Sequence, residues 1–516
     1  MTKEEALKTY YGYDAFRGGQ EAVIDALLSG RDALAIMPTG AGKSVCYQIP
    51  ALLLPGITLV VSPLVSLMRD QVTQLVQMGI PAAFLNSSLT FRQYLLALDR
   101  AKEGRYKIIY VAPERLETEG FQSFVREADI SLVAVDEAHC ISQWGQDFRP
   151  SYLNIPAFVE GLPRRPPVGA FTATATPDVK ADIRRLLDLR DPLELTTGFD
   201  RENLYFEVQQ PSDKRAALLE LVKSRPGKCG IVYCATRKTV EEVCDFLRQR
   251  GVSAARYHAG LDPEERQRNQ EDFLYDRVQV MVATNAFGMG INKPNVRFVI
   301  HYNMPKDLES YYQEAGRAGR DGEPARCVLL YAGMDVRTIR FLMEREQENQ
   351  TDLPPEVKAE AAEKAEERLK YMTYYSTTRR CLRGFILGYF GQKAPARCGR
   401  CSACLALERE ERAAAARMEA ARQNPPPRRS APKAAPDEFD QKLLSALYGL
   451  RKRLAARAKI PAFLVLGDAA LREICAKKPV SLDEFRSIPG VNEAKTARYG
   501  VSFVRLVQEM LDSRNG

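Results

Sequence analysis

The sequence predicts an α/β protein, with two tandem doubly wound domains built on parallel sheets and smaller helical parts after them. Short apolar runs alternate with helical patterns from about residue 20 to residue 340, which is typical of parallel strands joined by helices. The chain has 516 residues, enough for about three or four domains. We assign the first α/β domain to residues 1–200 and the second to residues 201–340, joined near Thr197–Leu204.

The expected strands are short apolar runs bounded by turn signals. The first series comprises Ala33–Met37, Thr58–Ser62, Ile108–Val111, Leu132–Val135 and Val168–Phe171. The second series comprises Cys229–Cys234, Ser253–Tyr257, Gln279–Ala283, Phe298–His301 and Arg326–Tyr331.

The rest of the chain is expected to be helical, apart from one linker. Residues 356–370 are rich in Glu, Lys and Ala and predict a helix within a helical module over 341–404. Composition then shifts to Ala, Arg and Pro, so we expect a flexible linker over 405–436. Apolar residues at helical spacing return in residues 437–516 and predict a small all-α domain there.

Composition places the chain among soluble proteins. Hydrophobic residues make up 45% and charged residues 27% of the sequence, and no apolar run approaches the roughly 20 residues of a membrane span. We therefore expect a cytoplasmic protein without a membrane partner, associated with the nucleoid if the source is bacterial. The formal net charge is +8, and residues 405–516 hold 21 Lys and Arg against 14 Asp and Glu. This excess favours a polyanionic partner, and a solvated basic tail is the alternative.

A Gly-rich turn follows the first expected strand. Residues 37–44 read M-P-T-G-A-G-K-S. A strand that enters such a turn and then a helix presents backbone N–H groups to phosphate oxygens, while the lysine reaches the β- and γ-phosphates and the hydroxyl binds Mg²⁺. Met37 stands where the strict pattern has its first glycine. The nucleotide-binding candidates are Thr39, Gly40, Ala41, Gly42, Lys43 and Ser44.

Adjacent carboxylates follow a second apolar run. Leu132–Val135 leads into the D-E-A-H sequence at 136–139. Asp136 is suited to the Mg²⁺ coordination sphere and Glu137 to polarising the attacking water, and His139 completes the catalytic candidates in this box. Together with the Gly-rich turn, these residues predict a site that binds and hydrolyses a nucleoside triphosphate.

The second domain carries an arginine pair near its end. Residues 312–322 read Y-Q-E-A-G-R-A-G-R-D-G, with Arg317 and Arg320 three positions apart. On one helical face both guanidinium groups would point the same way, and domain closure would bring them to the triphosphate as arginine fingers. The alternative is two arginines on a solvated helix face.

These segments resemble the helicase motifs of superfamily 2, and in particular the RecQ family of DNA helicases. The resemblance covers residues 8–404 and resumes at 437–516, and it implies two RecA-like motor domains, ATP, Mg²⁺ and DNA. F-R-G-G-Q at 16–20 is similar to the family's adenine-recognition motif, which implies base contacts by Tyr13, Arg17 and Gln20. V-S-P-L-V-S-L-M-R-D-Q at 61–71 resembles the motif that grips the single strand, and T-A-T-A-T at 172–176 the motif that couples hydrolysis to domain movement.

An aromatic loop follows the D-E-A-H box. The chain continues C-I-S-Q-W-G-Q-D-F-R-P-S-Y and contains its single Trp here. An aromatic ring beside the ATP-site carboxylates could stack on an unpaired base, an interaction worth about 1–3 kcal/mol. The resemblance implies that Trp144, Phe148 and Arg149 sense DNA, and packing of the two rings in the core is the alternative.

Four of the 11 cysteines have the spacing of a metal site. Cys381 is followed by Cys398, Cys401 and Cys404, and two Cys-x₂-Cys steps with one remote cysteine are typical of a closed, structural zinc site. A redox or disulfide role is the alternative. The resemblance also implies Zn²⁺ at this point of the chain.

The end of the chain resembles the HRDC domain, a small helical module appended to many RecQ proteins. F-R-S-I-P-G-V-N-E-A-K-T-A-R-Y-G at 485–500 carries this resemblance, and DNA binding by the module and a solvated basic face both remain open. RecQ proteins usually place a winged-helix domain before HRDC, which the short stretch after Cys404 cannot supply.

The resemblance implies an ATP-dependent DNA helicase that moves 3′ to 5′ on single-stranded DNA and unwinds duplexes and junctions in DNA repair and recombination. The missing winged helix makes a DNA-stimulated ATPase that translocates, anneals or remodels with weak unwinding the alternative. An RNA helicase fits the motor motifs but not the aromatic loop, the cysteine spacing or the HRDC-like tail.

Overall fold

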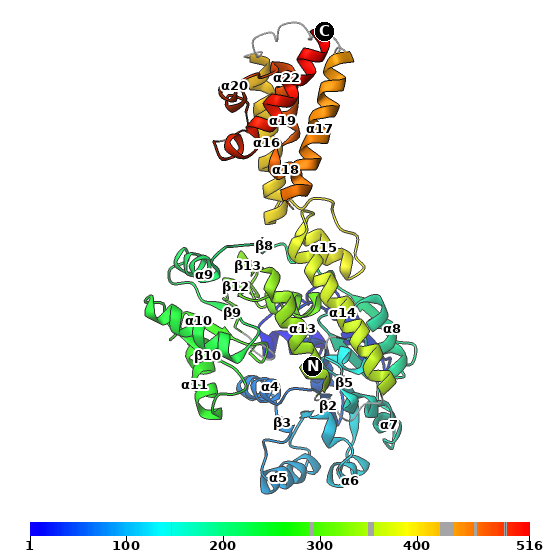
Figure 1. Cartoon of the computed structure of the whole chain (residues 1–516). Coiled ribbons are helices and arrows are strands. Elements are labelled where there is room, and N and C mark those ends of the chain that lie inside the picture. The colour runs from blue at the N-terminus through cyan, green and yellow to red at the C-terminus, as the bar shows by residue number, and fades with distance from the viewer. Residues whose placement is uncertain are drawn as a thin grey trace. The chain divides into compact units, whose positions relative to one another are not determined.

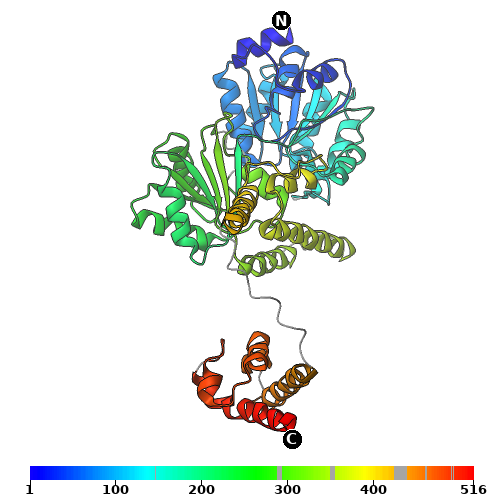
Figure 2. The same ribbon diagram turned by 90° about the horizontal axis from the view of Figure 1, so that it is seen from above.

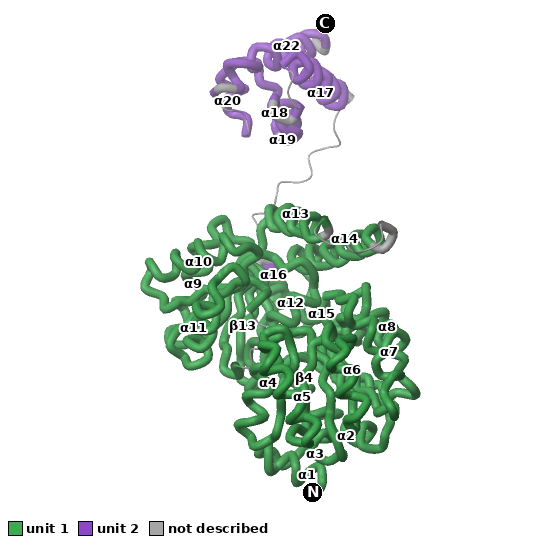
Figure 3. Tube along the Cα trace, turned by 90° about the horizontal axis from the view of Figure 1, so that it is seen from below, with its two compact units in different colours: residues 1–412 green, residues 413–516 purple. Residues whose placement is uncertain are grey.

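The structure is a computed structural model that describes residues 1–145, 147–287, 293–348, 355–423, 438–458, 462–489, 491 and 493–515. The chain divides into two compact units, residues 1–412 and 413–516 (Figure 3). Unit 1 contains both sheets and the four clustered cysteines, and unit 2 is helical.

The first sheet of unit 1 has seven parallel strands among the described residues, in the order β3-β4-β2-β5-β6-β1-β7. Figure 1 labels β2, β3 and β5 of this sheet. Its strands are β1 (Ala33–Ile36), β2 (Ile57–Val61), β3 (Ala82–Leu85), β4 (Ile108–Val111), β5 (Ile130–Val135), β6 (Val168–Thr172) and β7 (Leu193–Thr196). Its helices are α1 (Lys3–Ala6), η1 (Leu7–Tyr11), α2 (Gln20–Leu28), α3 (Val45–Leu53), α4 (Val65–Gln77), α5 (Phe91–Lys102), η2 (Pro113–Arg115), α6 (Glu119–Glu127), η3 (Ala138–Ile141), η4 (Pro150–Asn154), α7 (Ile155–Glu160) and α8 (Pro177–Leu186).

The second sheet has six parallel strands in the described ranges, in the order β10-β11-β9-β12-β13-β8. Its strands are β8 (Leu204–Gln209), β9 (Gly230–Tyr233), β10 (Ala254–Tyr257), β11 (Val280–Ala283), β12 (Phe298–His301) and β13 (Ala325–Leu330). Its helices are α9 (Lys214–Lys223), α10 (Arg237–Gln249), α11 (Pro263–Leu274) and α12 (Leu308–Ala315). Figure 2 shows the two sheets in separate lobes, the first in blue and cyan and the second in green.

The predicted fold class is confirmed, since two parallel sheets are followed by helical modules. Each of the ten expected strands is present within two residues of its expected bounds, and β3, β7 and β8 were not predicted. Strand pairing brings the predicted ATP-site segments together. β6 pairs with both β1 and β5, so the turn after β1 and the carboxylates after β5 lie at the same edge of the sheet.

A helical module follows the second sheet. It contains α13 (Gly333–Glu348), α14 (Pro355–Thr377) and α15 (Leu382–Tyr389). Buried rings join it to the second domain, because Tyr375 of α14 packs on Tyr311 of α12 with ring centroids 4.9 Å apart. The last strand, the hinge and this module therefore share one hydrophobic core.

The first part of the predicted linker is helical, which corrects the expected flexible chain over 405–436. Helix α16 (Ser402–Gln423) occupies it, because Ala, Glu and Arg have high helix propensity and this stretch lacks Pro and Gly until residue 425. The three prolines at 425–427 lie outside the described residues.

Unit 2 has the small helical domain expected for residues 437–516. Its helices after α16 are α17 (Glu438–Ala458), α18 (Ala462–Val465), α19 (Asp468–Lys477), α20 (Leu482–Arg486), α21 (Glu493–Lys495), η5 (Thr496–Gly500) and α22 (Val501–Asn515). They bury a core that includes Leu443, Leu471, Phe485 and Phe503. None of the helices in the described ranges combines the length and apolar composition that crossing a membrane requires.

Candidate ATP site, aromatic loop and metal centre

The Gly-rich turn at 37–44 forms a loop between β1 and α3 that can receive phosphates. Gly40 and Gly42 have φ values of +89° and +83°, a backbone region that favours glycine. A Cβ on Gly42 would lie 2.5 Å from Nε2 of Gln20, so the loop has no room for a side chain there. Helix α3 begins directly after Ser44, and its first N–H groups, those of Val45 and Cys46, donate to the carbonyls of Gly42 and Lys43 at 3.2 and 3.0 Å.

The residues expected to contact adenine lie beside this loop. The amide of Gln20 donates to the carbonyl oxygens of Ala41 and Gly42, both at 3.1 Å, and its oxygen accepts from the backbone N–H of Arg17 at 2.8 Å. The Arg17 guanidinium lies 5.3 Å from the centre of the Tyr13 ring, which is half exposed. Gln20 thus braces the loop, while Tyr13 and Arg17 offer an open stacking surface.

The pKa values of the two D-E-A-H carboxylates are shifted in opposite directions. Burial and the neighbouring charge of Glu137 raise the pKa of Asp136 to about 6, against the attraction of Lys43. Burial opposes ionisation of Glu137 as well, but Lys43, His139 and Arg317 together lower its pKa. Glu137 also has a left-handed φ of +47°, which is uncommon for a residue with a side chain. Its Oε2 lies 3.8 Å from Lys43 Nζ and makes no hydrogen bond to the described residues.

A chain of polar contacts runs from His139 to the second domain. Nδ1 of His139 lies 2.8 Å from Oγ1 of Thr172, which donates to the carbonyl of Thr174. The Thr174 hydroxyl in turn accepts from Nε2 of Gln313 at 3.1 Å. Gln313 belongs to α12, so the T-A-T-A-T segment connects the carboxylates to the helix that precedes the arginines.

Arg317 and Arg320 lie in a turn, which corrects the expected helical face. Helix α12 ends at Ala315 because the turn that follows requires Gly319 at a φ of +56°, where a Cβ would clash with Asn203. The turn still faces the ATP site, since Arg317 lowers the pKa of Glu137 and Cγ of Arg320 lies 3.4 Å from the Cβ position of Gly40. Burial, Arg317 and Arg201 lower the pKa of Arg320 to about 9.

The residues present fit Mg²⁺ and a triphosphate. Gly42 has no space for a side chain, Oε2 of Glu137 is buried and makes no hydrogen bond to the described residues, and Lys43, Arg317 and Arg320 supply positive charge around them. Ser44 and Asp136 could hold the metal ion with oxygen ligands, as Mg²⁺ prefers. Three basic side chains, from both domains, and the two carboxylates of the D-E-A-H box thus surround the place where the phosphates and the metal ion would bind.

The aromatic loop is anchored next to the D-E-A-H box. Ser142 donates to Asp182 at 2.7 Å and accepts from the Trp144 N–H at 3.1 Å. Arg149 points inward, donating to the carbonyl of Pro63 at 2.9 Å and to Asp147 at 3.2 Å. The Trp144 side chain is not core packing, because the residue is 42% exposed. Phe148 is partly buried within the loop.

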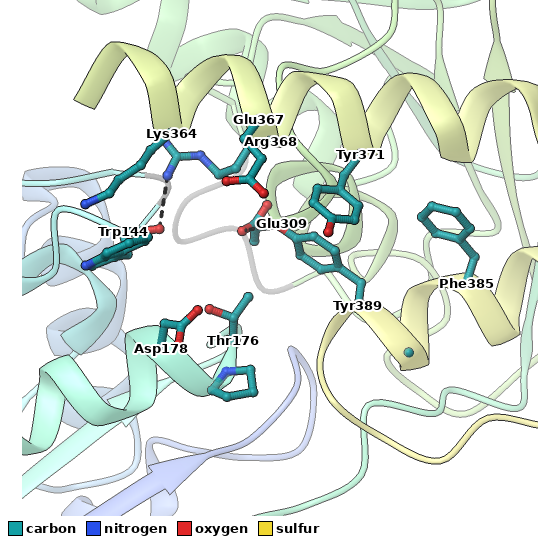
Figure 4. A pocket seen from close by; sticks show the side chains of 12 residues that line it. Trp144, Thr176, Asp178, Glu309, Lys364, Glu367, Arg368, Tyr371, Phe385 and Tyr389 are labelled. Atoms are coloured by element: carbon teal, nitrogen blue, oxygen red, sulfur yellow. Dashed lines mark hydrogen bonds between the residues drawn. The ribbon is translucent and has the colours of Figure 1, made fainter. Parts of the chain in front are cut away.

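Trp144 lines a cavity of about 430 Å³ between both domains and the helical module (Figure 4). Nζ of Lys364 lies 3.3 Å from the Trp144 ring centre, and Arg368 donates to the Trp144 carbonyl at 3.0 Å. Opposite them, Tyr389 donates to Glu309 at 2.7 Å, and burial together with Asp307 raises the pKa of Glu309 to about 7. Two residues of α14 therefore hold the loop.

The four predicted metal ligands come together. The Sγ atoms of Cys381, Cys398, Cys401 and Cys404 all lie within 4.8 Å of one another. A tetrahedral zinc site with bonds of about 2.3 Å places its sulfurs about 3.8 Å apart, so the set fits Zn²⁺ with small adjustments.

Backbone N–H groups donate to these sulfurs. The N–H groups of Leu382, Gly384 and Arg400 donate to Cys401, Cys381 and Cys398 at 3.4, 3.3 and 3.3 Å. Such bonds stabilise thiolates and orient them toward a metal. All four ligand positions are filled by protein, which is the composition of a structural site.

Sequence reasoning missed three residues at these sites. Lys364 and Arg368 contact the aromatic loop from a helix more than 200 positions away, and Arg201 contacts the Gly-rich turn from the hinge. Each of the three is a single basic residue outside any motif, so no sequence pattern marks it as part of a site.

Family models match four segments of the chain. The DEAD/DEAH box helicase model matches residues 17–182 and the helicase conserved C-terminal domain matches residues 213–322. The RecQ zinc-binding model matches residues 333–405, which include the four cysteines, and the HRDC domain matches residues 440–507.

Curated relatives extend over nearly the whole chain. The ATP-dependent DNA helicase RecQ of Bacillus subtilis (strain 168) is 39% identical, and the alignment covers 98% of each chain. It runs over 592 positions, more than the 516 residues present, so that relative has segments which this chain lacks. The ATP-dependent DNA helicase RecQ of Haemophilus influenzae is 44% identical over 78% of this chain and 64% of its own length.

Solved structures share the fold of the two sheets. The DEAD-box helicase Mss116 bound to ssRNA and UDP-BeF matches with a TM-score of 0.56 and 19% identity, covering 77% of this chain and 91% of that one. S. cerevisiae Dbp5 bound to RNA and ADP BeF3 matches with a TM-score of 0.53 and 20% identity, covering 70% and 97%. At these identities the likeness shows the fold alone.

Proposed function

Because the chain belongs to the RecQ family of ATP-dependent DNA helicases, we propose that it uses ATP hydrolysis to move 3′ to 5′ on single-stranded DNA and to unwind duplexes during DNA repair and recombination. The observation that carries the proposal is the contact between the arginine turn of the second domain and the Gly-rich turn of the first. A site completed by two domains makes hydrolysis depend on closure, and alternating closure and opening can drive movement along a strand.

Each residue of the site has a role in this proposal. Glu137 remains ionised at neutral pH and orients and deprotonates the attacking water. Lys43 binds the β- and γ-phosphates, while Arg317 and Arg320 stabilise the charge that develops on the transferred group. Bound between Ser44 and Asp136, Mg²⁺ would supply neutralisation of the phosphate oxygens.

DNA is sensed at the aromatic loop in this proposal. The loop is anchored through Ser142 and joined to the carboxylates through η3, so a base that stacks on Trp144 could shift His139 and Glu137. Trp144 is 42% exposed, and because Lys364 covers one face of its ring, a base would stack on the other face or displace Lys364. Aromatic stacking is independent of base identity.

Replacing Trp144 with Ala is expected to reduce the stimulation of ATPase by single-stranded DNA about tenfold, because the coupling between sites is lost while the ATP site is intact. ATPase with and without oligonucleotide and DNA affinity by anisotropy measure this. Phe91→Ala, which removes another exposed ring far from the loop, is the matched control. Unchanged stimulation with a thermal midpoint several degrees lower would assign Trp144 a structural role.

A second candidate function is a DNA-stimulated ATPase that translocates, anneals or remodels with weak unwinding. The observation that favours it is that α16, which begins within the cysteine cluster, is the one element before α17 in the described residues, whereas a winged helix would need three helices and a hairpin. The longer B. subtilis relative is in keeping with a segment missing from this chain.

Strand displacement distinguishes the two candidates. A helicase is expected to separate 3′-tailed duplexes and not 5′-tailed or blunt ones, whereas the second candidate shows DNA-stimulated ATPase with little displacement on any of them.

Removal of residues 437–516 is expected to leave both ATPase and strand displacement largely intact, since unit 1 has its own core. Loss of unwinding on this truncation, with ATPase retained, would instead assign duplex engagement to unit 2.

A further inference from the structure

Arg201 belongs to none of the sequence motifs described above, yet it contacts both turns of the ATP site. It lies in the segment between β7 and β8 that joins the two domains. Its Nη1 donates to the carbonyl of Thr39 at 2.8 Å and of Gly316 at 3.3 Å. Its Nη2 donates to the carbonyls of Ala318 at 3.0 Å and Gly319 at 2.8 Å. One guanidinium therefore joins the Gly-rich turn of the first domain to the arginine turn of the second.

The turns that Arg201 joins are in close contact. The Cβ position of Gly316 lies 3.5 Å from Cβ of Thr39, and Nη1 of Arg201 lies 3.5 Å from the Cβ position of Gly40. A planar guanidinium offers five N–H donors in a fixed geometry, which suits several carbonyls at once. Because Gly316 to Gly319 flank Arg317 and precede Arg320, the position of Arg201 decides where both arginines stand relative to the phosphate loop.

The hinge that carries Arg201 is held by the module that contains the cysteines. Arg383 of α15 is buried, pairs with Asp200, and donates to the carbonyls of Arg201 at 2.9 Å and Leu204 at 2.6 Å. Two further residues of the module hold the start of the hinge. Phe390 stacks on Phe199 with centroids 4.5 Å apart, and Gln392 accepts from the Phe199 N–H at 2.9 Å.

We propose that Arg201 is a positioning residue for ATP hydrolysis, which sets the arginine turn against the phosphate loop, and that Arg383 fixes Arg201 from the cysteine-containing module. The inference rests on the proposed ATPase. It gives the module a role in catalysis besides any contact with DNA, because the same helix that follows Cys381 supports the interdomain contact.

Arg201→Ala is expected to lower kcat for ATP about 10²-fold, since misplacement of catalytic groups by about an ångström has effects of this size. Nucleotide affinity, measured with a fluorescent ATP analogue, should change less than about threefold because Lys43 and the glycine cradle are untouched. Arg201→Lys should not restore kcat, since an ammonium cannot form the same fork of bonds. Arg383→Ala should lower kcat in the same direction while zinc content stays at the wild-type level.

Arg340→Ala is the matched control. Arg340 of α13 is half exposed and pairs with Glu366 of α14 in the same module, and this partner lies in neither turn, so its loss should leave kcat unchanged. Thermal unfolding of every variant reports general destabilisation. Wild-type kcat in Arg201→Ala would overturn the proposal, as would equal losses of kcat and nucleotide affinity.

A double variant tests whether Arg201 acts through the arginine turn. Under the proposal, Arg201→Ala should cost little further kcat in an Arg320→Ala background, because the group it positions is already absent. Fully additive losses would show that Arg201 acts elsewhere and would overturn the positioning role. Failure of the proposed ATPase itself appears separately, as a wild-type protein that binds ATP without hydrolysing it in the presence of DNA.

Discussion

Replacing Glu137 with Gln is expected to lower ATP turnover about 10³-fold while ATP binding is retained, because the carboxamide keeps the shape of the side chain but cannot accept a proton from water. The wild-type carboxylate is ionised at neutral pH, since Lys43, His139 and Arg317 lower its pKa below the ordinary value. Steady-state ATPase and fluorescent-nucleotide binding measure the two quantities.

Lys43→Ala provides the contrast to this variant. Its ammonium is the one predicted to bind phosphates, so both nucleotide affinity and turnover should fall. Substantial residual kcat in Glu137→Gln would remove the catalytic role proposed for that residue, and normal nucleotide affinity in Lys43→Ala would do the same for the lysine.

Replacing Cys401 with Ser is expected to reduce bound zinc to near zero and to destabilise the helical module, because metal binding supplies folding free energy that a short segment lacks. Cys401 is fully buried and accepts from the Leu382 N–H, so the start of α15 should loosen with it. Zinc content, hydrogen exchange of residues 356–404 and duplex affinity measure the effects.

Cys475→Ser is the matched control for this experiment. Cys475 is a buried cysteine of unit 2 outside the cluster, so its replacement should leave zinc unchanged. A wild-type protein that purifies without zinc and does not take it up would contradict the site. Full zinc occupancy in Cys401→Ser would contradict the assignment of this ligand.

Sequence patterns predicted the sheets and the chemistry best where local rules are strict. A phosphate loop needs glycines at left-handed φ, and a structural metal site needs cysteines at short spacing, so both are visible in the residues themselves.

Three strands of the two sheets were not predicted, each for a physical reason. β7 alternates between half-buried and exposed residues at a sheet edge, β3 begins with two alanines, and β8 begins at Leu204, where the predicted join between the domains ends.

Contacts between distant segments could not be predicted. Helix α12 was expected to continue through Arg320, but the turn is selected by tertiary contacts with Asn203 and the Gly-rich loop. Likewise, Arg201 acts through backbone carbonyls, which every residue has, so no partner residue type marks it in the sequence. The helix α16 was missed because composition alone does not separate a solvated helix from a flexible chain.

The strand order of the first sheet has a consequence for folding during synthesis. β1, which ends in the phosphate loop, pairs with β6 and β7 alone, although both are made last in this domain. At about 5–20 residues per second, translation leaves the apolar β1 without a neighbouring strand for roughly 7 to 27 s after it leaves the ribosome. The strand support of the Gly-rich turn is therefore completed late, and a ribosome stalled before Val168 holds a chain in which β1 has neither of its neighbouring strands.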